Sequence, residues 1–361
     1  MAILKKIFHH PKNVKKRHEK RHVDREEEVF ESSTKYSGNP IIIPDPETSW
    51  KSWQTFNPAA VLLQDTVHLL YRAIGSDGVS RFGYARSKDG FHLDTYSSDN
   101  PAYCEKDETT GFTFNSPYSG GSFFGSEDPR LTYMEDGDML YTLYTSCSDG
   151  LRVGLSSITR DNFLAQRWDT WSERKLISPP DEVHKNWVLF PEKIKGKYAI
   201  CHSLSPLSIE YLDDLEFADG AYIQSTYRAD QPSERWDLHM RGAGSPPIRT
   251  DEGWLLFYHA MNHKDKSCYR IGALLLDIQD PTVILYRSEK PVLTPTESYE
   301  NEGHKSGVVY TTGAVVMDGD LLLYYGGADT VVCVAHANLQ DFLEELKGSE
   351  KVADKKQHKV R

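Results

Sequence analysis

The feature that most constrains the fold of this chain is a pattern of paired strands that recurs five times between about residues 40 and 340. In each repeat, a segment rich in aromatic and β-forming residues is followed by a polar turn and then by a segment of small and branched residues. The first segments span residues 68–72, 140–144, 198–202, 254–258 and 321–325, and their partners span 82–85, 152–155, 207–211, 269–273 and 330–334.

Helical periodicity is nearly absent from this region. The clearest exception is residues 338–346, where Leu339, Phe342, Leu343 and Leu346 recur at helical spacing. Many short strands without intervening helices argue against a parallel α/β sheet. Because radial repetition protects the edges of so many strands, the sequence predicts an all-β fold, a five-bladed β-propeller with a short C-terminal helix. A β-sandwich or a pair of barrels is the alternative that the repeats alone leave open.

The charges are unevenly distributed along the chain. Residues 1–26 carry nine Lys or Arg side chains and three acidic ones, although the whole chain has a formal net charge of −11. We therefore predict three parts. A basic extension that is partly disordered or helical covers residues 1–37, a catalytic propeller domain covers residues 38–345, and a charged tail covers residues 346–361. The oligomeric state stays open, and a homo-oligomer that forms through the charged termini is one alternative.

Several partners and locations are excluded by composition. The acidic remainder of the chain predicts no nucleic-acid partner, because such binding depends on neutralising phosphates. No segment approaches the roughly 20 apolar residues of a spanning helix, so we predict no membrane partner. The five cysteines are far apart, which argues against a disulfide framework or a structural zinc site, and we expect no metal. Without a recognisable secretory signal, the expected location is cytoplasmic.

Polar residues cluster at the ends of several of the apolar segments. Asn57 precedes the first repeat, Arg72 ends its first segment, and Glu127, Asp128 and Arg130 fall within four residues. In a propeller these positions would converge on one central channel. Paired carboxyl groups are what the cleavage of a glycosidic bond needs, whereas single Arg–acid neighbours are often structural ion pairs. Motifs for nucleotide loops, serine hydrolases and zinc proteases do not occur.

Motifs from all five repeats resemble, in order, those of glycoside hydrolase family 130, which comprises β-mannoside phosphorylases and some β-mannosidases. They are Phe56-Asn57-Pro58, Tyr71-Arg72, residues 87–91, residues 127–130, residues 189–192, Gly242-Ala243-Gly244, Tyr258-His259 and residues 325–329. The resemblance implies a five-bladed propeller that acts with inversion on β-linked mannosides. In the phosphorylases, inorganic phosphate attacks the anomeric carbon and releases mannose 1-phosphate. Phosphate is then a co-substrate, and no cofactor is expected.

The resemblance also implies roles for individual residues. Asp128 matches the proton donor, which passes its proton through a hydroxyl of the mannose ring. The positions expected to bind the substrate are Asn57, Arg72, Glu127, Arg130, Tyr258, His259 and Asp329.

The expected phosphate site departs in part from the family pattern. Lys185 and Asn186 match a basic-plus-Asn pair, but Ser203 stands where an Arg is common and Met240-Arg241 stands where a Lys is common. Arg241 can compensate, since a guanidinium binds phosphate through two hydrogen bonds. The cationic set of Lys185, Asn186 and Arg241 favours phosphorolysis.

Two alternatives stay open at this point. In a hydrolase of the same family a carboxylate must activate water, and Glu192, Glu300 and Glu302 are the candidates. Glu192 is equally a candidate for a structural ion pair. A propeller that only binds sugars is the alternative from another class, and it would not need Asp128.

Overall fold

The computed structural model describes residues 29–96, 99–105, 122, 124–148, 150–226, 235–261 and 267–352. Within these ranges the fold is all-β, as predicted, and the helices are few and short. They are α1 (Arg160–Leu164), α2 (Ser298–Asn301), α3 (Leu339–Gly348) and the 3-10 turns η1 (Ser49–Lys51) and η2 (Trp168–Thr170). The predicted helix near the end of the chain is therefore confirmed as α3. Residues 1–28 of the predicted extension lie outside the described residues.

The strands of the described residues form five antiparallel groups. The first comprises β2 (Gln54–Leu63), β3 (Thr66–Ile74), β4 (Val79–Ser87) and β5 (Leu93–Tyr96), and the second comprises β6 (Phe124–Met134), β7 (Met139–Ser146), β8 (Arg152–Thr159) and β9 (Lys175–Leu176). The third comprises β10 (Val188–Leu189), β11 (Tyr198–Leu204) and β12 (Leu207–Leu212). A short parallel pairing between β4 and β6 joins the first two groups.

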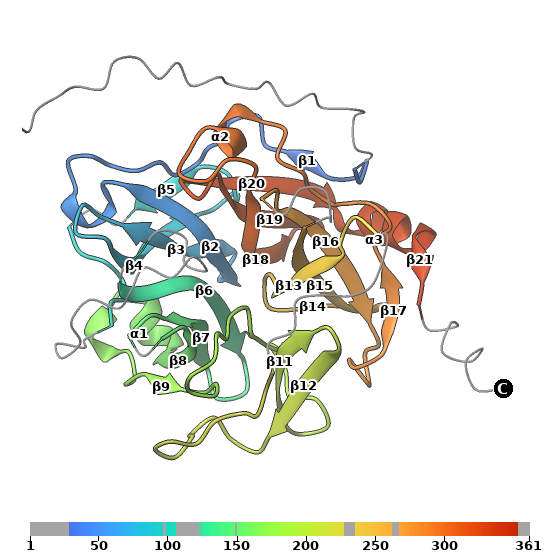
Figure 1. Ribbon diagram of the computed structural model, residues 1–361, viewed down its shortest axis with the longest axis horizontal. Coiled ribbons are helices and arrows are strands. Elements are labelled where there is room, and N and C mark those ends of the chain that lie inside the picture. The colour runs from blue at the N-terminus through green and yellow to red at the C-terminus, as the bar shows by residue number, and fades with distance from the viewer. Residues whose placement is uncertain are drawn as a thin grey trace, which may run out of the picture.

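The remaining two groups contain the ends of the described chain. The fourth comprises β13 (His239–Ala243), β14 (Ile248–Thr250), β15 (Gly253–Met261), β16 (Arg270–Leu276), β17 (Ile284–Arg287) and β21 (Glu350–Lys351). The fifth comprises β18 (Val309–Met317), β19 (Asp320–Gly327), β20 (Val331–Asn338) and β1 (Thr34–Lys35). Figure 1 shows the five groups around a common centre, with β2, β6, β13 and β18 nearest to it.

The sequence repeat corresponds to the middle of each group. The five aromatic segments are β3, β7, β11, β15 and β19, and their partners lie in β4, β8, β12, β16 and β20. The strands nearest the centre were not predicted. Two of them contain an internal proline, Pro58 in β2 and Pro129 in β6, and proline normally argues against a central strand.

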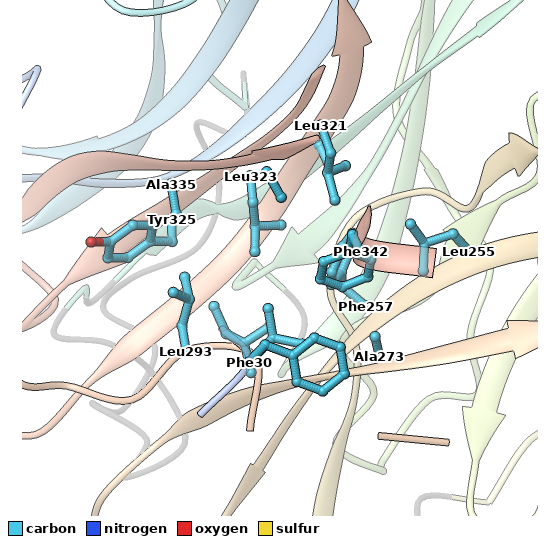
Figure 2. Close-up of a cluster of buried hydrophobic side chains, with 14 of the residues drawn as sticks. Phe30, Leu255, Phe257, Ala273, Leu293, Leu321, Leu323, Tyr325, Ala335 and Phe342 are labelled. Carbon is cyan, nitrogen blue, oxygen red and sulfur yellow. The ribbon is translucent and has the colours of Figure 1, made fainter. Parts of the chain in front are cut away.

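Apolar clusters fill the spaces between neighbouring groups. In the cluster of Figure 2, Phe257 of β15 and Leu323 of β19 lie with Phe342 of α3. Phe30 belongs to the same cluster, and β1 pairs with β20, so residues from the predicted N-terminal extension pack on the body. Likewise β21, from the predicted tail, pairs with β17. No helix in the described ranges is long and apolar enough to cross a membrane.

Candidate active site

The inner strands are irregular at positions that carry polar residues. Four of these strands, within the described part of the chain, carry one extra residue relative to their partner strands. The extra residue is Asn57 in β2, one of Asp128 and Pro129 in β6, Arg241 in β13 and Thr312 in β18. Asn57 and Asp128 have positive φ angles of 46° and 51°, which Asn and Asp tolerate better than most residues. Such bulges redirect side chains and are common beside active sites.

Asp128 is the centre of the group that these bulges assemble. Its Oδ1 accepts hydrogen bonds from Nδ2 of Asn57 at 2.7 Å and from Nη1 of Arg72 at 3.0 Å. No donor among the described residues bonds to Oδ2, which leaves that oxygen available to carry a proton. Burial acts to raise the pKa of the Asp128 carboxyl, but Arg72 and Lys185 outweigh burial and hold the pKa below its ordinary value.

The neighbouring carboxylate, Glu127, is engaged by the protein itself. Its Oε1 accepts hydrogen bonds from Nη2 of Arg72 at 2.8 Å and from the Ser122 hydroxyl at 2.5 Å. Its Oε2 accepts one from Nζ of Lys185 at 3.0 Å. The side chain of Glu127 is fully buried. Through these contacts Glu127 binds the side chains of two cations, Arg72 and Lys185. The geometry does not show the predicted contact of Glu127 with substrate.

Arg130 links three of the strand groups near the centre. Its guanidinium donates to the carbonyl of Asp128 at 2.8 Å, to the carbonyl of Gly244 at 2.9 Å and to Oδ1 of Asn186 at 2.8 Å. The Tyr310 hydroxyl donates to the same Asn186 oxygen at 2.7 Å. Because this fully buried Arg is tied to backbone oxygens, it fixes the bulge that carries Asp128.

His259 lies beside this arrangement. Its ring stacks on Tyr310 with centroids 3.6 Å apart, and its Nε2 donates to the carbonyl of Thr311 at 2.6 Å. Burial lowers the pKa of His259 to about 3, so the ring is neutral at physiological pH. The Nδ1 atom is buried without a partner among the described residues.

A small hollow adjoins Lys185 on the side of the third and fourth groups. The polar residues that line it are Lys185, Asn186, His202, Ser203, Thr226 and Arg241. Nδ2 of Asn186 donates to the carbonyl of Arg241 at 2.7 Å, which joins two of the predicted phosphate-binding residues. Cationic and hydroxyl donors of this kind suit an oxyanion. Ser203 and Thr226 contribute hydroxyls on the side where the family resemblance expects an Arg.

Asp329 lies in the turn between β19 and β20, close to the start of β2. Nε2 of Gln54 donates to its backbone carbonyl at 2.6 Å, and its φ is 50°. Burial raises the pKa of Asp329 above its ordinary value, although Lys305 and Arg72 oppose that effect. Asp128 and Asp329 therefore differ in environment: the pKa of the first is lowered and that of the second is raised.

Comparison with known proteins identifies the family. A sequence profile described as beta-1,4-mannooligosaccharide phosphorylase, from glycoside hydrolase family 130, matches residues 13–347. The chain belongs to glycoside hydrolase family 130. It is therefore an enzyme of a glycoside-cleaving family, as its motifs indicated.

Relatives of this family 130 protein include proteins named as phosphorylases. A 1,2-beta-oligomannan phosphorylase of Thermoanaerobacter sp. (strain X514) is 34% identical, over 84% of this chain and 97% of the relative. A beta-1,2-mannobiose phosphorylase of Listeria innocua is 32% identical, over 73% of this chain and 67% of the relative. A solved structure of the beta-1,2-mannobiose phosphorylase from Listeria innocua, in complex with beta-1,2-mannobiose, superposes with a TM-score of 0.68 at 26% identity. That superposition covers 88% of this chain and 99% of the other.

Some predicted site residues lie away from the Asp128 group of this family 130 enzyme. Tyr258 is fully buried in an apolar cluster, and its hydroxyl donates to Oδ2 of Asp237 at 2.6 Å. Glu192, a candidate base for hydrolysis, forms a half-exposed ion pair with Arg249. Of the other two candidates, Glu300 accepts hydrogen bonds from Lys35 and Tyr325, and Glu302 is exposed.

Other residues of the site were missed by sequence reasoning. Ser122, Tyr310 and Gln54 lack a charged side chain and lie outside the recognised motifs, so nothing in the sequence alone distinguishes them. Thr312 is also not distinguished by the sequence, because only the strand register shows that it is a bulge residue. The described ranges hold no cluster of three or more His, Cys, Asp or Glu side chains that could bind a metal.

Proposed function

We propose that this enzyme cleaves β-mannosidic bonds in manno-oligosaccharides by phosphorolysis, with inversion, to give mannose 1-phosphate. The observation that carries the proposal is the pairing of Asp128, whose Oδ2 accepts no hydrogen bond from the described part of the chain, with an adjoining hollow lined by Lys185, Asn186 and Arg241. An acid and an oxyanion site side by side are the two parts that phosphorolysis requires.

The proposed chemistry assigns a separate task to each part. One phosphate oxygen forms a bond to the anomeric carbon on the face opposite the leaving oxygen, and the glycosidic C–O bond breaks. The leaving oxygen takes a proton that originates on Oδ2 of Asp128, relayed by a hydroxyl of the mannose ring. Asn57 and Arg72 donate to Oδ1 and stabilise the carboxylate that remains. Bound phosphate beside Lys185 weakens the cationic effect that lowers the pKa of Asp128, which favours the protonated donor.

Arg72, Asn57, Arg130 and Asp329 form the proposed mannose subsite. The five strand groups are, in this proposal, the blades of a five-bladed propeller, with the subsite at its centre. Supporting this view, the bulged inner strands β2, β6, β13 and β18 lie nearest the centre of the molecule (Figure 1).

The linkage that the relatives support best is β-1,2. Two relatives from Thermoanaerobacter that match over most of their length are a 1,2-beta-oligomannan phosphorylase and a beta-1,2-mannobiose phosphorylase. A beta-1,4-mannooligosaccharide phosphorylase from Ruminococcus albus matches over 47% of this chain. We therefore propose β-1,2-linked manno-oligosaccharides as the substrate.

The test is incubation of the full chain with β-1,2- and β-1,4-mannobiose, with and without inorganic phosphate. We expect mannose 1-phosphate only when phosphate is present. Free mannose released without phosphate would instead establish a hydrolase, and binding without cleavage would establish a sugar-binding protein. The Asp128→Asn variant should lose about 10²–10⁴-fold in turnover, the usual contribution of a general acid, while its circular dichroism spectrum stays that of the folded wild type.

A further inference from the structure

An exposed tryptophan lies at the edge of the proposed mannose subsite. Trp53 has 43% of its surface exposed, whereas Trp50, Trp187 and Trp254 are buried. Its backbone N–H donates to the carbonyl of Ile74 at 3.0 Å, which fixes it at the end of the strand that carries Arg72. A single exposed aromatic side chain is ordinary on a protein surface, so only the surroundings of Trp53 can indicate a ligand.

The neighbours of Trp53 connect it with Asp329. The next residue, Gln54, donates from its side chain to the Asp329 carbonyl at 2.6 Å. The ring of His304 meets the Trp53 ring edge-on, with centroids 5.0 Å apart and an interplanar angle of 84°. The N–H of His304 donates to the Thr330 hydroxyl at 2.8 Å, and that residue follows Asp329.

Lys305 is fixed to the same turn from the other direction. Its backbone N–H donates to the carbonyl of Ala328 at 2.9 Å, so residues 304 and 305 are both held on the turn that carries Asp329. Lys305 and His304 each act to lower the pKa of Asp329, which agrees with their positions close to its carboxyl group. Trp53, His304 and Lys305 therefore form a rim around this turn.

Exposure rises from the interior of the site toward this rim. Arg72 is 1% exposed and Asp128 is 4% exposed, Asp329 is 6% exposed, and Trp53 is 43% exposed. If the glycosidic bond is cleaved beside Asp128, the mannosyl unit that is transferred occupies the interior. The rest of the bound oligosaccharide must then extend from the interior toward the surface. If it extends past Asp329, it lies against the rim.

We propose that Trp53, His304 and Lys305 form the subsite for the sugar on the leaving-group side of the cleaved bond. This inference rests on the proposed function. A pyranose ring presents C–H groups on one face and hydroxyls at its edge. The indole face of Trp53 covers the C–H groups, and the imidazole of His304 and the ammonium of Lys305 bond to the hydroxyls.

The reverse, synthetic reaction tests this subsite separately, because its donor and its acceptor have separate KM values. Mannose 1-phosphate serves as donor and β-1,2-mannobiose as acceptor, and release of phosphate is measured. Trp53→Ala should raise the KM for the acceptor about tenfold, equivalent to the loss of one good aromatic contact. The KM for mannose 1-phosphate should not change, because the donor occupies the interior. Trp53→Phe should recover most of the affinity for the acceptor.

The control is Tyr222→Ala, which removes another exposed aromatic side chain outside the proposed site. It should leave both KM values unchanged. An acceptor KM that is the same in Trp53→Ala as in the wild type would overturn the subsite while the proposed function stands. Equal increases in both KM values would do so as well, since they would indicate general damage to the site. A wild-type enzyme that makes no product would instead refute the proposed function, and the subsite with it.

Discussion

The two glutamates that were candidates for the active site offer a matched pair for testing what holds the site together. Both form an ion pair with an arginine, Glu127 with Arg72 and Glu192 with Arg249. They differ in burial: both side chains of the first pair are at most 1% exposed, and those of the second pair are about half exposed. Replacing each glutamate by glutamine removes one negative charge and preserves the size of the side chain.

The expected magnitudes follow from this difference in burial. Glu127→Gln leaves Arg72 and Lys185 buried without their shared counter-charge. The loss of one partner from a buried ion pair costs about 3–5 kcal/mol in free energy of unfolding. Glu192→Gln breaks an ion pair in water, which costs about 0–1 kcal/mol. Since many domains are stable by only about 5–15 kcal/mol, the first change is a large fraction of the total.

The assay is urea unfolding at pH 7, followed by circular dichroism, at low and at high salt. The midpoint and slope give the free energy of unfolding for each variant. We expect the cost of Glu127→Gln to be nearly independent of salt, because salt screens buried charges poorly, and the small cost of Glu192→Gln to shrink further. A cost below about 1 kcal/mol for Glu127→Gln, the range of an exposed pair, would refute the reasoning that this carboxylate holds Arg72 and Lys185 in place.

Three further predictions follow from the site. A Cβ on Gly326 would lie 2.1 Å from Oδ1 of Asn57. Gly326→Ala should therefore displace Asn57 from Asp128 and lower kcat about tenfold, and thermal unfolding serves as the control for folding. Burial raises the pKa of Asp329 above its ordinary value of 3.8, so its contribution to stability is present below that pH and is lost as the pH rises through the folded-state value. Asp329→Asn should therefore stabilise the protein more at pH 7 than at pH 4 in thermal unfolding, and an equal effect at both would contradict this. Arg241→Ala should raise the KM for phosphate at least about tenfold in steady-state kinetics and leave the KM for the mannoside unchanged. A raised KM for the mannoside with an unchanged KM for phosphate would show that Arg241 does not bind phosphate.

The regular strands of this fold could be predicted because their pattern is local. Residues 254–258 and 321–325 are apolar and β-forming over their whole length, and they became β15 and β19. The inner strands β2 and β6 could not be recognised in the same way. Each contains a polar residue followed by proline, Asn57-Pro58 and Asp128-Pro129, which reads as a turn. A sheet accommodates them only because a bulge takes up the extra residue.

The composition of the site was largely predictable, but the division of tasks within it was not. The family motifs predicted that Asp128, Asn57 and Arg72 lie in one site. In the structure, Asn57 and Arg72 both donate hydrogen bonds to Asp128. The same reasoning treated Glu127 as a contact for substrate, although both of its carboxylate oxygens accept hydrogen bonds from protein side chains. It also included Tyr258, whose hydroxyl donates a hydrogen bond to Asp237. Whether a side chain faces a ligand or a protein partner depends on residues far away in the sequence.

The order of residue types along the chain determined that many short strands would form and that acids and cations would lie close to them. Only the tertiary structure decided which carboxyl group keeps an open oxygen. Among the described residues, Asp128 has one because Asn57 and Arg72 both approach Oδ1, whereas Arg72, Ser122 and Lys185 occupy both oxygens of Glu127. The physical reason is that hydrogen bonds, Coulomb attraction and desolvation depend on distances of a few ångströms and on burial. Those quantities exist only after separate strand groups have packed around one centre.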